Sequence, residues 1–290
     1  MNQLLILSGK GGTGKTTMAS AFIKLSNAKA FADCDVDAPN LHLVIEHSSL
    51  PKKTDYFGNP KAEIDTDKCI NCGKCIELCR FNAISVEDGL YKVKLFDCEG
   101  CGLCEYACPA GAISSEPAKA GELMLFNDDD RVFSTAQLKM GSGHSGKLVT
   151  EVKRQMRDNA GKANFAIIDG SPGIGCPVIA SLSGVDLVLI VAEPSVSGIS
   201  DMERIIKTSY MFGPQIAVCI NKYDTNLINT KKIEEFCQSK RLSFVGKIPF
   251  DPEAAKAINI GLTIADVECP SGEAVKQVFN NTMTVFSDQT

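Results

Sequence analysis

Short apolar runs alternate along most of this chain with stretches whose apolar residues recur at helical spacing. Residues 18–25 place four apolar side chains on one helix face, and residues 147–157 and 230–241 carry similar helix signals. The apolar runs are continuous, which is typical of strands buried on both faces. They lie at 4–7, around 31, and at 165–168, 185–192, 216–220 and 244–248. This alternation predicts an α/β fold with a mostly parallel sheet covered by helices on both faces.

Polar residues directly follow several of the predicted strands. Asp33-Cys34-Asp35 follows the second strand, and Asp169, Glu193, Asn221 and Pro249 follow later ones. In a parallel sheet, ligands bind beyond the carboxyl ends of the strands. We therefore treat these polar residues as candidates for one shared site.

The alternation is interrupted in the first half of the chain. Residues 46–62 are polar and contain Pro51, Gly58 and Pro60, so we expect a linker there. A cysteine-rich stretch follows at 63–117, and the pattern after it is mixed, with an expected turn at 127–130. We predict one discontinuous α/β domain, formed by residues 1–62 and 118–290, with a small domain of residues 63–117 inserted into it.

A glycine-rich loop separates the first strand from the first helix. Residues 9–17 read Gly-Lys-Gly-Gly-Thr-Gly-Lys-Thr-Thr, which is the sequence and context of a phosphate-binding loop. Its glycines let backbone N–H groups converge on phosphate oxygens at a helix N-terminus. We expect Lys15 to contact the β- and γ-phosphates and Thr16 to coordinate Mg²⁺. The predicted nucleotide-contacting residues are Gly11, Gly12, Thr13, Gly14, Lys15, Thr16 and Thr17.

Composition narrows the range of partners. The net charge of −5 gives no electrostatic reason to bind nucleic acid or an anionic membrane. No apolar stretch approaches the ~18 residues that span a bilayer. Residues 1–8 lack the basic region of a signal peptide and lead directly into the glycine loop, so we expect a cytoplasmic protein.

Thirteen cysteines are unusual in a chain of this kind, and eight of them form two regular runs. Each run has the spacing C-x₂-C-x₂-C-x₃-C, and the second is displaced from the first by 29 residues. Zinc ligands usually come as two separated pairs, so a duplicated triplet plus a fourth cysteine favours iron–sulfur clusters over zinc. The runs are Cys69, Cys72, Cys75 and Cys79, followed by Cys98, Cys101, Cys104 and Cys108.

The lysine after the first glycine of the phosphate loop suggests a particular group of ATPases. With Lys10 in this position, the chain resembles the family of MinD and ParA positioning ATPases, the nitrogenase iron protein and the Mrp-type iron–sulfur carriers. In that family this lysine reaches across a dimer to the partner's nucleotide. The resemblance implies an ATP-dependent homodimer that hydrolyses ATP to ADP and phosphate with Mg²⁺, and in which Lys10 and Lys15 are catalytic.

The same resemblance assigns roles to the residues at the strand ends. Asp35 in the first switch orients or activates the attacking water, although Asp33 or Asp37 could share this role. Asp169 ends the strand at 165–168, in the segment 165–173 that matches Walker B and the second switch, and it holds the Mg²⁺ shell together with Thr16. Asn221 and Pro249 match the adenine-binding segments.

The inserted domain resembles a bacterial ferredoxin with two [4Fe–4S] clusters. In such proteins the fourth cysteine of each run ligates the other cluster. The resemblance therefore implies two crossed ligand sets. The first is Cys69, Cys72, Cys75 and Cys108, and the second is Cys98, Cys101, Cys104 and Cys79.

The sequence leaves three functions open for the whole chain. The first is ATP-gated electron transfer to a redox partner protein, as in the nitrogenase iron protein. The second is assembly or carriage of an iron–sulfur or other metallocofactor for a partner. The third is a positioning switch, which is disfavoured because residues 272–290 contain one basic residue, Lys276, and thus no basic membrane anchor.

Cys176 lies on the second switch, and we expect it to be a structural thiol.

Overall fold

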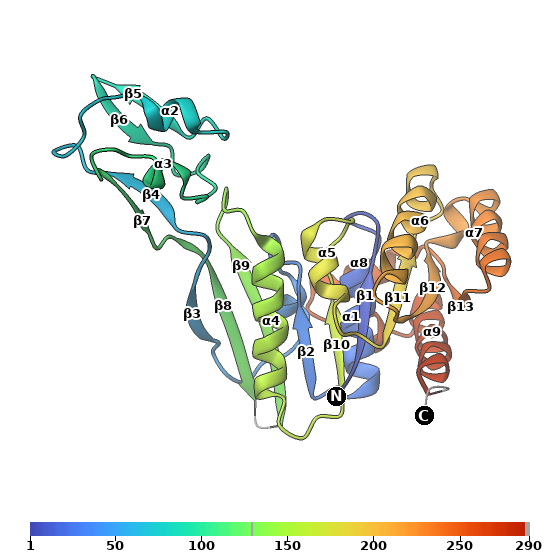
Figure 1. Ribbon diagram of the computed structural model, residues 1–290. Helices are drawn as coiled ribbons and strands as arrows, with labels where there is room; N and C mark the ends of the chain where they lie inside the picture. The colour runs from blue at the N-terminus through green and yellow to red at the C-terminus, as the bar shows by residue number, and fades with distance from the viewer. Residues whose placement is uncertain (129, 288–290) are drawn as a thin grey trace. The chain divides into compact units, whose positions relative to one another are not determined.

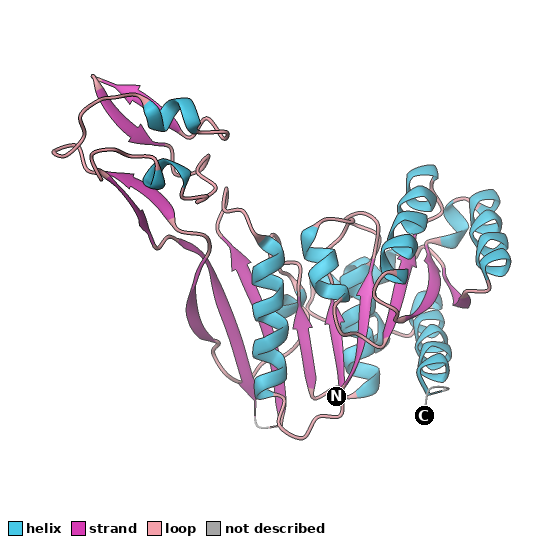
Figure 2. Cartoon of the chain, in the orientation of Figure 1, coloured by secondary structure: helices cyan, strands magenta, loops and turns pink. Residues whose placement is uncertain are grey.

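The computed structural model describes residues 1–128 and 130–287, which fold into two compact units (Figures 1 and 2). The first unit comprises Met1–Lys53, Leu123–Gln137 and the chain from Gly146 onward. The second comprises Thr54–Glu122 and Leu138–Ser145, so it contains all of the predicted insert and further residues on both sides. The expected turn at 127–130 and the C-terminal stretch 272–290 lie partly outside the described residues.

A nine-stranded sheet runs in the order β13-β12-β11-β1-β10-β2-β9-β8-β3. All neighbours from β13 to β9 pair in parallel, so the predicted mostly parallel sheet is confirmed. The central strand β1 lies between β10 and β11, which brings the phosphate loop beside the ends of those two strands. The strands are β1 (Asn2–Leu7), β2 (Ala30–Asp33), β3 (Lys52–Phe57), β8 (Lys119–Asp128), β9 (Arg131–Leu138), β10 (Phe165–Asp169), β11 (Leu187–Ala192), β12 (Gln215–Asn221) and β13 (Ser243–Ile248).

Helices cover both faces of this sheet, because successive side chains of a strand point to opposite faces. Leu4 and Ile6 pack in one core with Phe22 of α1 and Val278 of α9, whereas Leu5 is buried on the other face. In Figure 1, α4, α5 and α6 lie on the face opposite α1 and α9. The α-helices are α1 (Lys15–Ser26), α4 (Ser145–Asn159), α5 (Cys176–Leu182), α6 (Val196–Tyr210), α7 (Leu227–Lys240), α8 (Pro252–Asn259) and α9 (Pro270–Ser287); short 3₁₀ turns lie at Leu41–Leu43, Tyr223–Thr225 and Ile264–Asp266.

The predicted linker at 46–62 is wrong, because this stretch contains β3 and also β4 (Lys61–Ile64). Five of the six β3 residues are exposed, so this edge strand lacks the apolar run that would have predicted a strand from the sequence. The strands β8 and β9 were also missed in the mixed region. In β9 the buried residues include Ser134 and Thr135, which dilute the apolar signal.

The second unit is built from a repeated half. Strand β4 pairs with β7 (Ile113–Glu116), and β5 (Ile84–Glu87) pairs with β6 (Leu90–Val93), both antiparallel. The helices α2 (Lys74–Leu78) and α3 (Leu103–Tyr106) each start after a glycine, with φ of 80° at Gly73 and 73° at Gly102. These glycines are 29 residues apart, so the sequence repeat extends to the backbone conformation.

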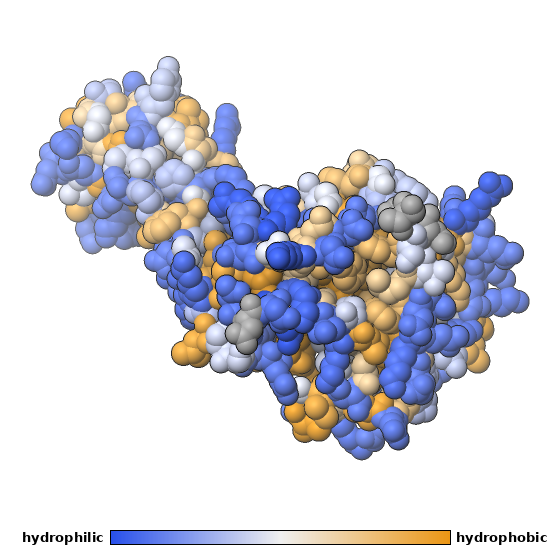
Figure 3. Space-filling view, turned by 90° about the horizontal axis from the view of Figure 1, so that it is seen from below, coloured by the Kyte–Doolittle hydropathy of each residue, from blue (hydrophilic) through white to orange (hydrophobic). Residues whose placement is uncertain are grey.

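The surface contains both hydrophilic and hydrophobic areas. Figure 3 shows hydrophilic residues over much of the face that it presents, with smaller hydrophobic areas between them. Exposed large apolar side chains occur in both units, for example Phe96 in the second and Ile228 in the first. Among the described residues, no helix is both long and apolar enough to cross a membrane.

His47 lies in a column of aromatic rings beside the edge of the sheet. Its ring stacks on Phe126 with centroids 4.2 Å apart and on Phe133 at 5.2 Å. Nδ1 of His47 lies 3.6 Å from a carboxylate oxygen of Asp128. Burial lowers the pKa of His47 and outweighs the opposing charge of Asp128, and Arg131 and His42 act in the same direction as burial.

We expect the protein to lose stability as the pH falls below the ordinary histidine value of about 6.5. A lowered pKa in the folded state means that the unfolded chain binds more protons in this range, so acid favours unfolding. His47→Phe keeps the ring stacking and removes this titration. Urea unfolding at about pH 8 and pH 5.5 should show a smaller loss of free energy of unfolding for the variant than for the wild type. An equal loss in both proteins would contradict the assignment to His47.

Candidate nucleotide site and cysteine pockets

The phosphate loop joins the central strand β1 to α1. Gly14 precedes α1 with φ of 92°, in the left-handed region that favours glycine. A Cβ added there would lie 2.2 Å from Nδ2 of Asn221, so close approach also requires glycine. Among the described residues no side chain caps the start of α1. The N–H groups of its first turn are thus available to an anion.

Lys15 and Thr16 both reach the carboxylate of Asp169 at the end of β10. Nζ of Lys15 donates to Oδ1 at 2.5 Å, and the Thr16 hydroxyl donates to Oδ2 at 2.7 Å. Although burial by itself lowers it, the pKa of Lys15 is raised overall, because Asp169 pairs with the ammonium group. A carboxylate beside a hydroxyl provides the hard oxygen ligands that Mg²⁺ prefers. The structure thus brings together the three side chains that the sequence assigned to phosphate and magnesium.

The three aspartates of the first switch have different surroundings. Asp33 is fully buried, and its carboxylate accepts hydrogen bonds from the backbone N–H groups of Asp35, Asn40 and Leu41. Burial and the nearby charge of Asp169 raise the pKa of Asp33 to about 7. Asp33 therefore fixes the backbone of the loop at residues 35–41 through these hydrogen bonds.

Asp35 and Asp37, in contrast to Asp33, line the large cavity beside the phosphate loop. Burial raises the pKa of Asp35, with Asp169 adding to the effect and Lys15 opposing it. Of the three aspartates, Asp35 combines a place on the cavity wall with a carboxylate of raised proton affinity. This is the position that the resemblance gives to the residue orienting the attacking water.

Lys10 is held by residues of its own chain. Its Nζ lies 3.1 Å from Oε2 of Glu193 and 3.3 Å from the Ser195 hydroxyl. Both partners follow β11, the strand beside β1 in the sheet. The sequence placed Glu193 at a strand end, but nothing in its pattern signalled that it would pair with Lys10.

Asn221 and Lys222 brace the phosphate loop from the end of β12. Nδ2 of Asn221 donates to the carbonyl of Thr13 at 2.7 Å, and Nζ of Lys222 donates to the carbonyl of Gly12 at 3.1 Å. Oδ1 of the Asn221 side chain also accepts the Lys222 N–H, which leaves one amide hydrogen and one lone pair of this side chain for a base. Pro249 lies in the loop after β13. Neither Asn221 nor Pro249 is among the described residues that line the large cavity.

This cavity opens beside the phosphate loop and has a volume of about 830 Å³. Its wall comes from the loop itself, from both switch segments and from the end of α8 at Ile258 and Asn259. This volume lies within the ~300–1,000 Å³ typical of small-molecule sites. A nucleotide therefore fits in it.

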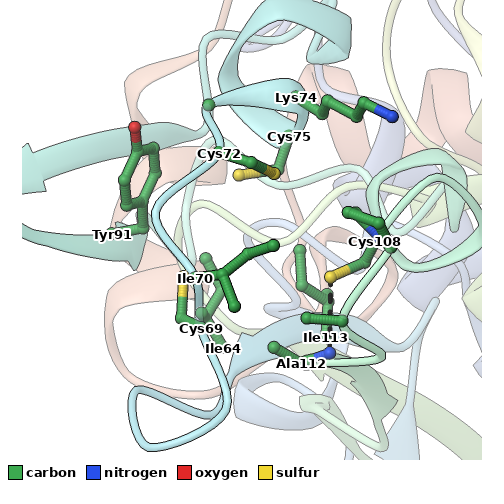
Figure 4. Close-up of a pocket in the computed structure, with 13 residues that line it drawn as sticks. Ile64, Cys69, Ile70, Cys72, Lys74, Cys75, Tyr91, Cys108, Ala112 and Ile113 are labelled. Carbon is green, nitrogen blue, oxygen red and sulfur yellow. Dashed lines mark hydrogen bonds between the residues drawn. The ribbon is translucent and has the colours of Figure 1, made fainter.

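Four cysteines line one pocket in the second unit (Figure 4). Three belong to the first run, and Cys108 comes from the second. The N–H of Ala112 donates to Sγ of Cys108 at 3.3 Å, as the dashed line in Figure 4 marks. The complete set of thiols is Cys69, Cys72, Cys75 and Cys108.

A second pocket repeats this arrangement with the two runs exchanged. Its thiols are those of Cys98, Cys101 and Cys104, together with Cys79 from the first run. The N–H of Ala83 donates to Sγ of Cys79 at 3.3 Å, the same distance as in the first pocket. The two pockets are also alike in size.

The donor chemistry of these pockets fits a thiolate-bound cluster. Four thiols per pocket match the ligand number of a [4Fe–4S] group, and N–H donation to sulfur is one of the features that tune such clusters. Among the described residues, no group of three or more His, Cys, Asp or Glu side chains is set to hold a single metal ion. A [4Fe–4S] group does not need such a group, because its four cysteines are shared among four irons.

The remaining five cysteines lie outside the pockets. Cys34, Cys219 and Cys237 are buried, as expected for thiols of the core. Cys269 is also buried, and its sulfur accepts the N–H of Gly272 at 3.3 Å. Cys176 is exposed at the start of α5, so it is not a thiol of the core, and its structural role stays a prediction.

The sequence of the chain matches one described domain family over most of its length. The matching family is the CobQ/CobB/MinD/ParA nucleotide-binding domain, and the match spans residues 4–264. The chain belongs to the CobQ/CobB/MinD/ParA family. The phosphate loop, Asp169 and the first switch all lie within the matched residues.

The sequences of several relatives match this chain over nearly its whole length. An uncharacterized protein of Methanocaldococcus jannaschii, MJ0578, is 33% identical over 281 residues, which is 96% of this chain and 95% of that protein. An iron–sulfur cluster carrier protein of Pyrococcus abyssi is 23% identical over 90% of this chain and 78% of its own length. This CobQ/CobB/MinD/ParA member is therefore related to proteins with and without a described role.

Solved structures of the family have the same fold. The septum site-determining protein MinD of Pyrococcus horikoshii, complexed with Mg-ADP, superposes with a TM-score of 0.59 at 16% identity, covering 100% of this chain and 98% of that one. This likeness supports the α/β P-loop fold with a mostly parallel sheet. The chain is thus a nucleotide-binding protein of the MinD/ParA type of ATPase.

Proposed function

We propose that this chain hydrolyses Mg-ATP as a homodimer, carries two [4Fe–4S] clusters, and couples ATP binding to electron transfer with a partner protein. The observation that carries the redox part is the pair of pockets, each lined by four thiols drawn from both cysteine runs. A nucleotide site and two thiol pockets in one chain are the parts that such coupling needs.

The site beside the phosphate loop supports the hydrolytic half of the proposal. Lys15 neutralises charge on the transferring phosphoryl group, and Thr16 and Asp169 hold Mg²⁺. Asp35 orients the attacking water from the cavity wall. The family resemblance implies that Lys10 reaches the nucleotide of the partner subunit, for which it must leave Glu193.

The thiol pockets support the redox half of the proposal. A [4Fe–4S] cluster stores one electron, and its potential depends on hydrogen bonds to sulfur and on solvent exposure. Cys72 and Cys101 occupy equivalent places in the two runs, and both are exposed. Each cluster would therefore lie near the surface, where a partner can exchange electrons with it.

The path of the chain gives a reason for the two halves to be coupled. The chain enters the second unit after Lys53, beyond the first switch, and finally leaves it at Gly146, before the second switch. Switch segments move when the γ-phosphate is bound or lost. Coupling must be reciprocal: if ATP shifts a cluster potential, reduction of that cluster shifts the affinity for ATP.

We expect a non-hydrolysable ATP analogue to shift at least one cluster potential by some tens of millivolts. For one electron, about 59 mV corresponds to about 1.4 kcal/mol, which is a tenfold change in nucleotide affinity. Redox titration with and without the analogue measures one direction, and nucleotide affinity for oxidised and reduced protein measures the other. Lys15→Ala serves as the control without nucleotide. Equal potentials and equal affinities in the wild type would contradict the coupling.

A second function rests on the likeness to an iron–sulfur cluster carrier protein. In this alternative the clusters are cargo, handed to an apo-protein when ATP is bound or hydrolysed. Incubation with an apo-ferredoxin separates the two functions. A carrier loses iron to the acceptor in an ATP-dependent way, whereas an electron-transfer protein keeps its iron and changes only its oxidation state.

A further inference from the structure

Helix α4 begins at the residue where the second unit ends. The segment 138–145 belongs to that unit and there lies against the loop that starts the second cysteine run. A Cβ added at Gly141 would lie 2.6 Å from the Phe96 ring. Nε2 of His144 lies 3.6 Å from Oε2 of Glu99, the residue directly after Cys98. The segment is thus in contact with one of the thiol-bearing loops.

In the first unit, the first turn of α4 packs closely on the start of α5. A Cβ added at Gly146 would lie 3.1 Å from the Cys176 carbonyl oxygen and 3.2 Å from the Cys176 Cβ. These distances are shorter than a side chain normally tolerates. Glycine at position 146 therefore lets the two helices approach at this end.

The middle of α4 holds the other end of α5. Nζ of Lys153 donates to the carbonyl oxygens of Ser181 and Ser183, both at 2.6 Å. The last carbonyls of a helix lack partners within it, and a cation there is favourable. Lys153 is only 5% exposed, and this burial lowers its pKa to about 8, still above neutral pH.

Helix α5 is in turn continuous with the second switch. In the residues before it, the Ser171 hydroxyl donates to the carbonyl of Cys34 in the first switch, at 2.5 Å. The N–H of Gly173 donates to the carbonyl of Ser8, at the start of the phosphate loop, at 3.0 Å. Any shift of the second switch therefore reaches α5 through the backbone.

We propose that Lys153, assisted by Gly146, is a positioning residue that makes α4 follow the second switch, so that nucleotide binding alters the segment 138–145 and the thiol-bearing loop beside it. Because α4 contacts both ends of α5, the two helices move as one body. The inference rests on the proposed function, and it names the route by which the two sites communicate.

Hydrogen–deuterium exchange of the full-length, cluster-loaded protein tests this route. We expect a non-hydrolysable ATP analogue to protect amides of the phosphate loop, residues 11–17, and to change exchange in 138–145 and 96–101. In Lys153→Met the protection of 11–17 should persist and the change in 138–145 should be lost. Arg154→Met is the matched control, since Arg154 is an exposed cation of the same helix that pairs with Glu151.

Gly146→Ala provides a second variant in case Lys153→Met unfolds. Alanine raises helix propensity by up to ~1 kcal/mol, so a loss of the distal change cannot be assigned to a weaker α4. The route is overturned if the wild type shows protection of 11–17 without any change in 138–145. It is also overturned if both variants keep the distal change. Absence of protection at 11–17 in the wild type would overturn the nucleotide site itself, and the route with it.

Discussion

Lys15→Ala is expected to abolish nucleotide binding at micromolar concentrations. The variant loses the charge that faces the β- and γ-phosphates, and it leaves the buried carboxylate of Asp169 without its cation. Breaking a buried ion pair from one side costs roughly 3–5 kcal/mol. This cost should lower the melting temperature. The missing charge at the phosphates should lower the affinity on the order of 10²–10³-fold, measured by equilibrium binding of a fluorescent ATP analogue.

Lys222→Ala is the matched control for this change. Lys222 also contacts the phosphate loop, but through the carbonyl of Gly12 and with an exposed side chain. Its removal should change the affinity no more than a few-fold. Equal effects of the two substitutions would contradict the specific role of Lys15.

Lys10→Ala separates binding from hydrolysis in the same experiment. We expect it to bind nucleotide as the wild type does, but to lose ATP-dependent dimerisation and turnover, by about 10²–10³-fold in kcat. Sedimentation with and without the ATP analogue measures the dimer. Loss of nucleotide binding by the Lys10→Ala monomer would remove the role across the dimer.

Changing the fourth cysteine of one run should damage the cluster that is held by the first three cysteines of the other run. Anaerobically purified wild type should hold about eight iron and eight acid-labile sulfide per chain, from two four-iron clusters. Cys79→Ser should lose the cluster held by Cys98, Cys101 and Cys104, because Cys79 lines that pocket. Iron analysis and electron paramagnetic resonance should show about four iron and one remaining signal.

Cys108→Ser is the matched variant, and it should lose the cluster held by Cys69, Cys72 and Cys75. Comparison with Cys69→Ser shows which cluster each signal belongs to, because Cys69 and Cys108 line the same pocket. If Cys79→Ser instead matched Cys69→Ser, the crossed arrangement would be wrong. A protein that contained only zinc would contradict the clusters altogether.

The sequence predicted the parts of this molecule whose signals are local. The strand–loop–helix around Lys15 and the apolar runs of the central strands are such signals, and the structure has both. β3 could not be predicted, because five of its six residues are exposed and only backbone pairing at the sheet edge makes it a strand. The pairing of Lys10 with Glu193 was also beyond the sequence, since it depends on the register of β1 and β11.

The three aspartates of the first switch also show what the sequence can and cannot predict. The resemblance assigned the catalytic role to Asp35, but the sequence left a share of it open to Asp33 and Asp37. The structure sets Asp33 apart from the other two, because backbone N–H groups occupy both of its carboxylate oxygens. Such a distinction requires the path of the loop, which no local pattern specifies.

The exchange of one thiol between the two pockets has a consequence for how this insert arose and how it assembles. Each half gives its fourth thiol to the pocket of the other half, so an isolated half would complete a pocket of this kind only by pairing with a second copy. Fusion of two such halves replaces that encounter with an intramolecular one, at an effective concentration of about millimolar for short connections. Filling one pocket also fixes both halves of the backbone, so the first cluster to enter prepares the site for the second.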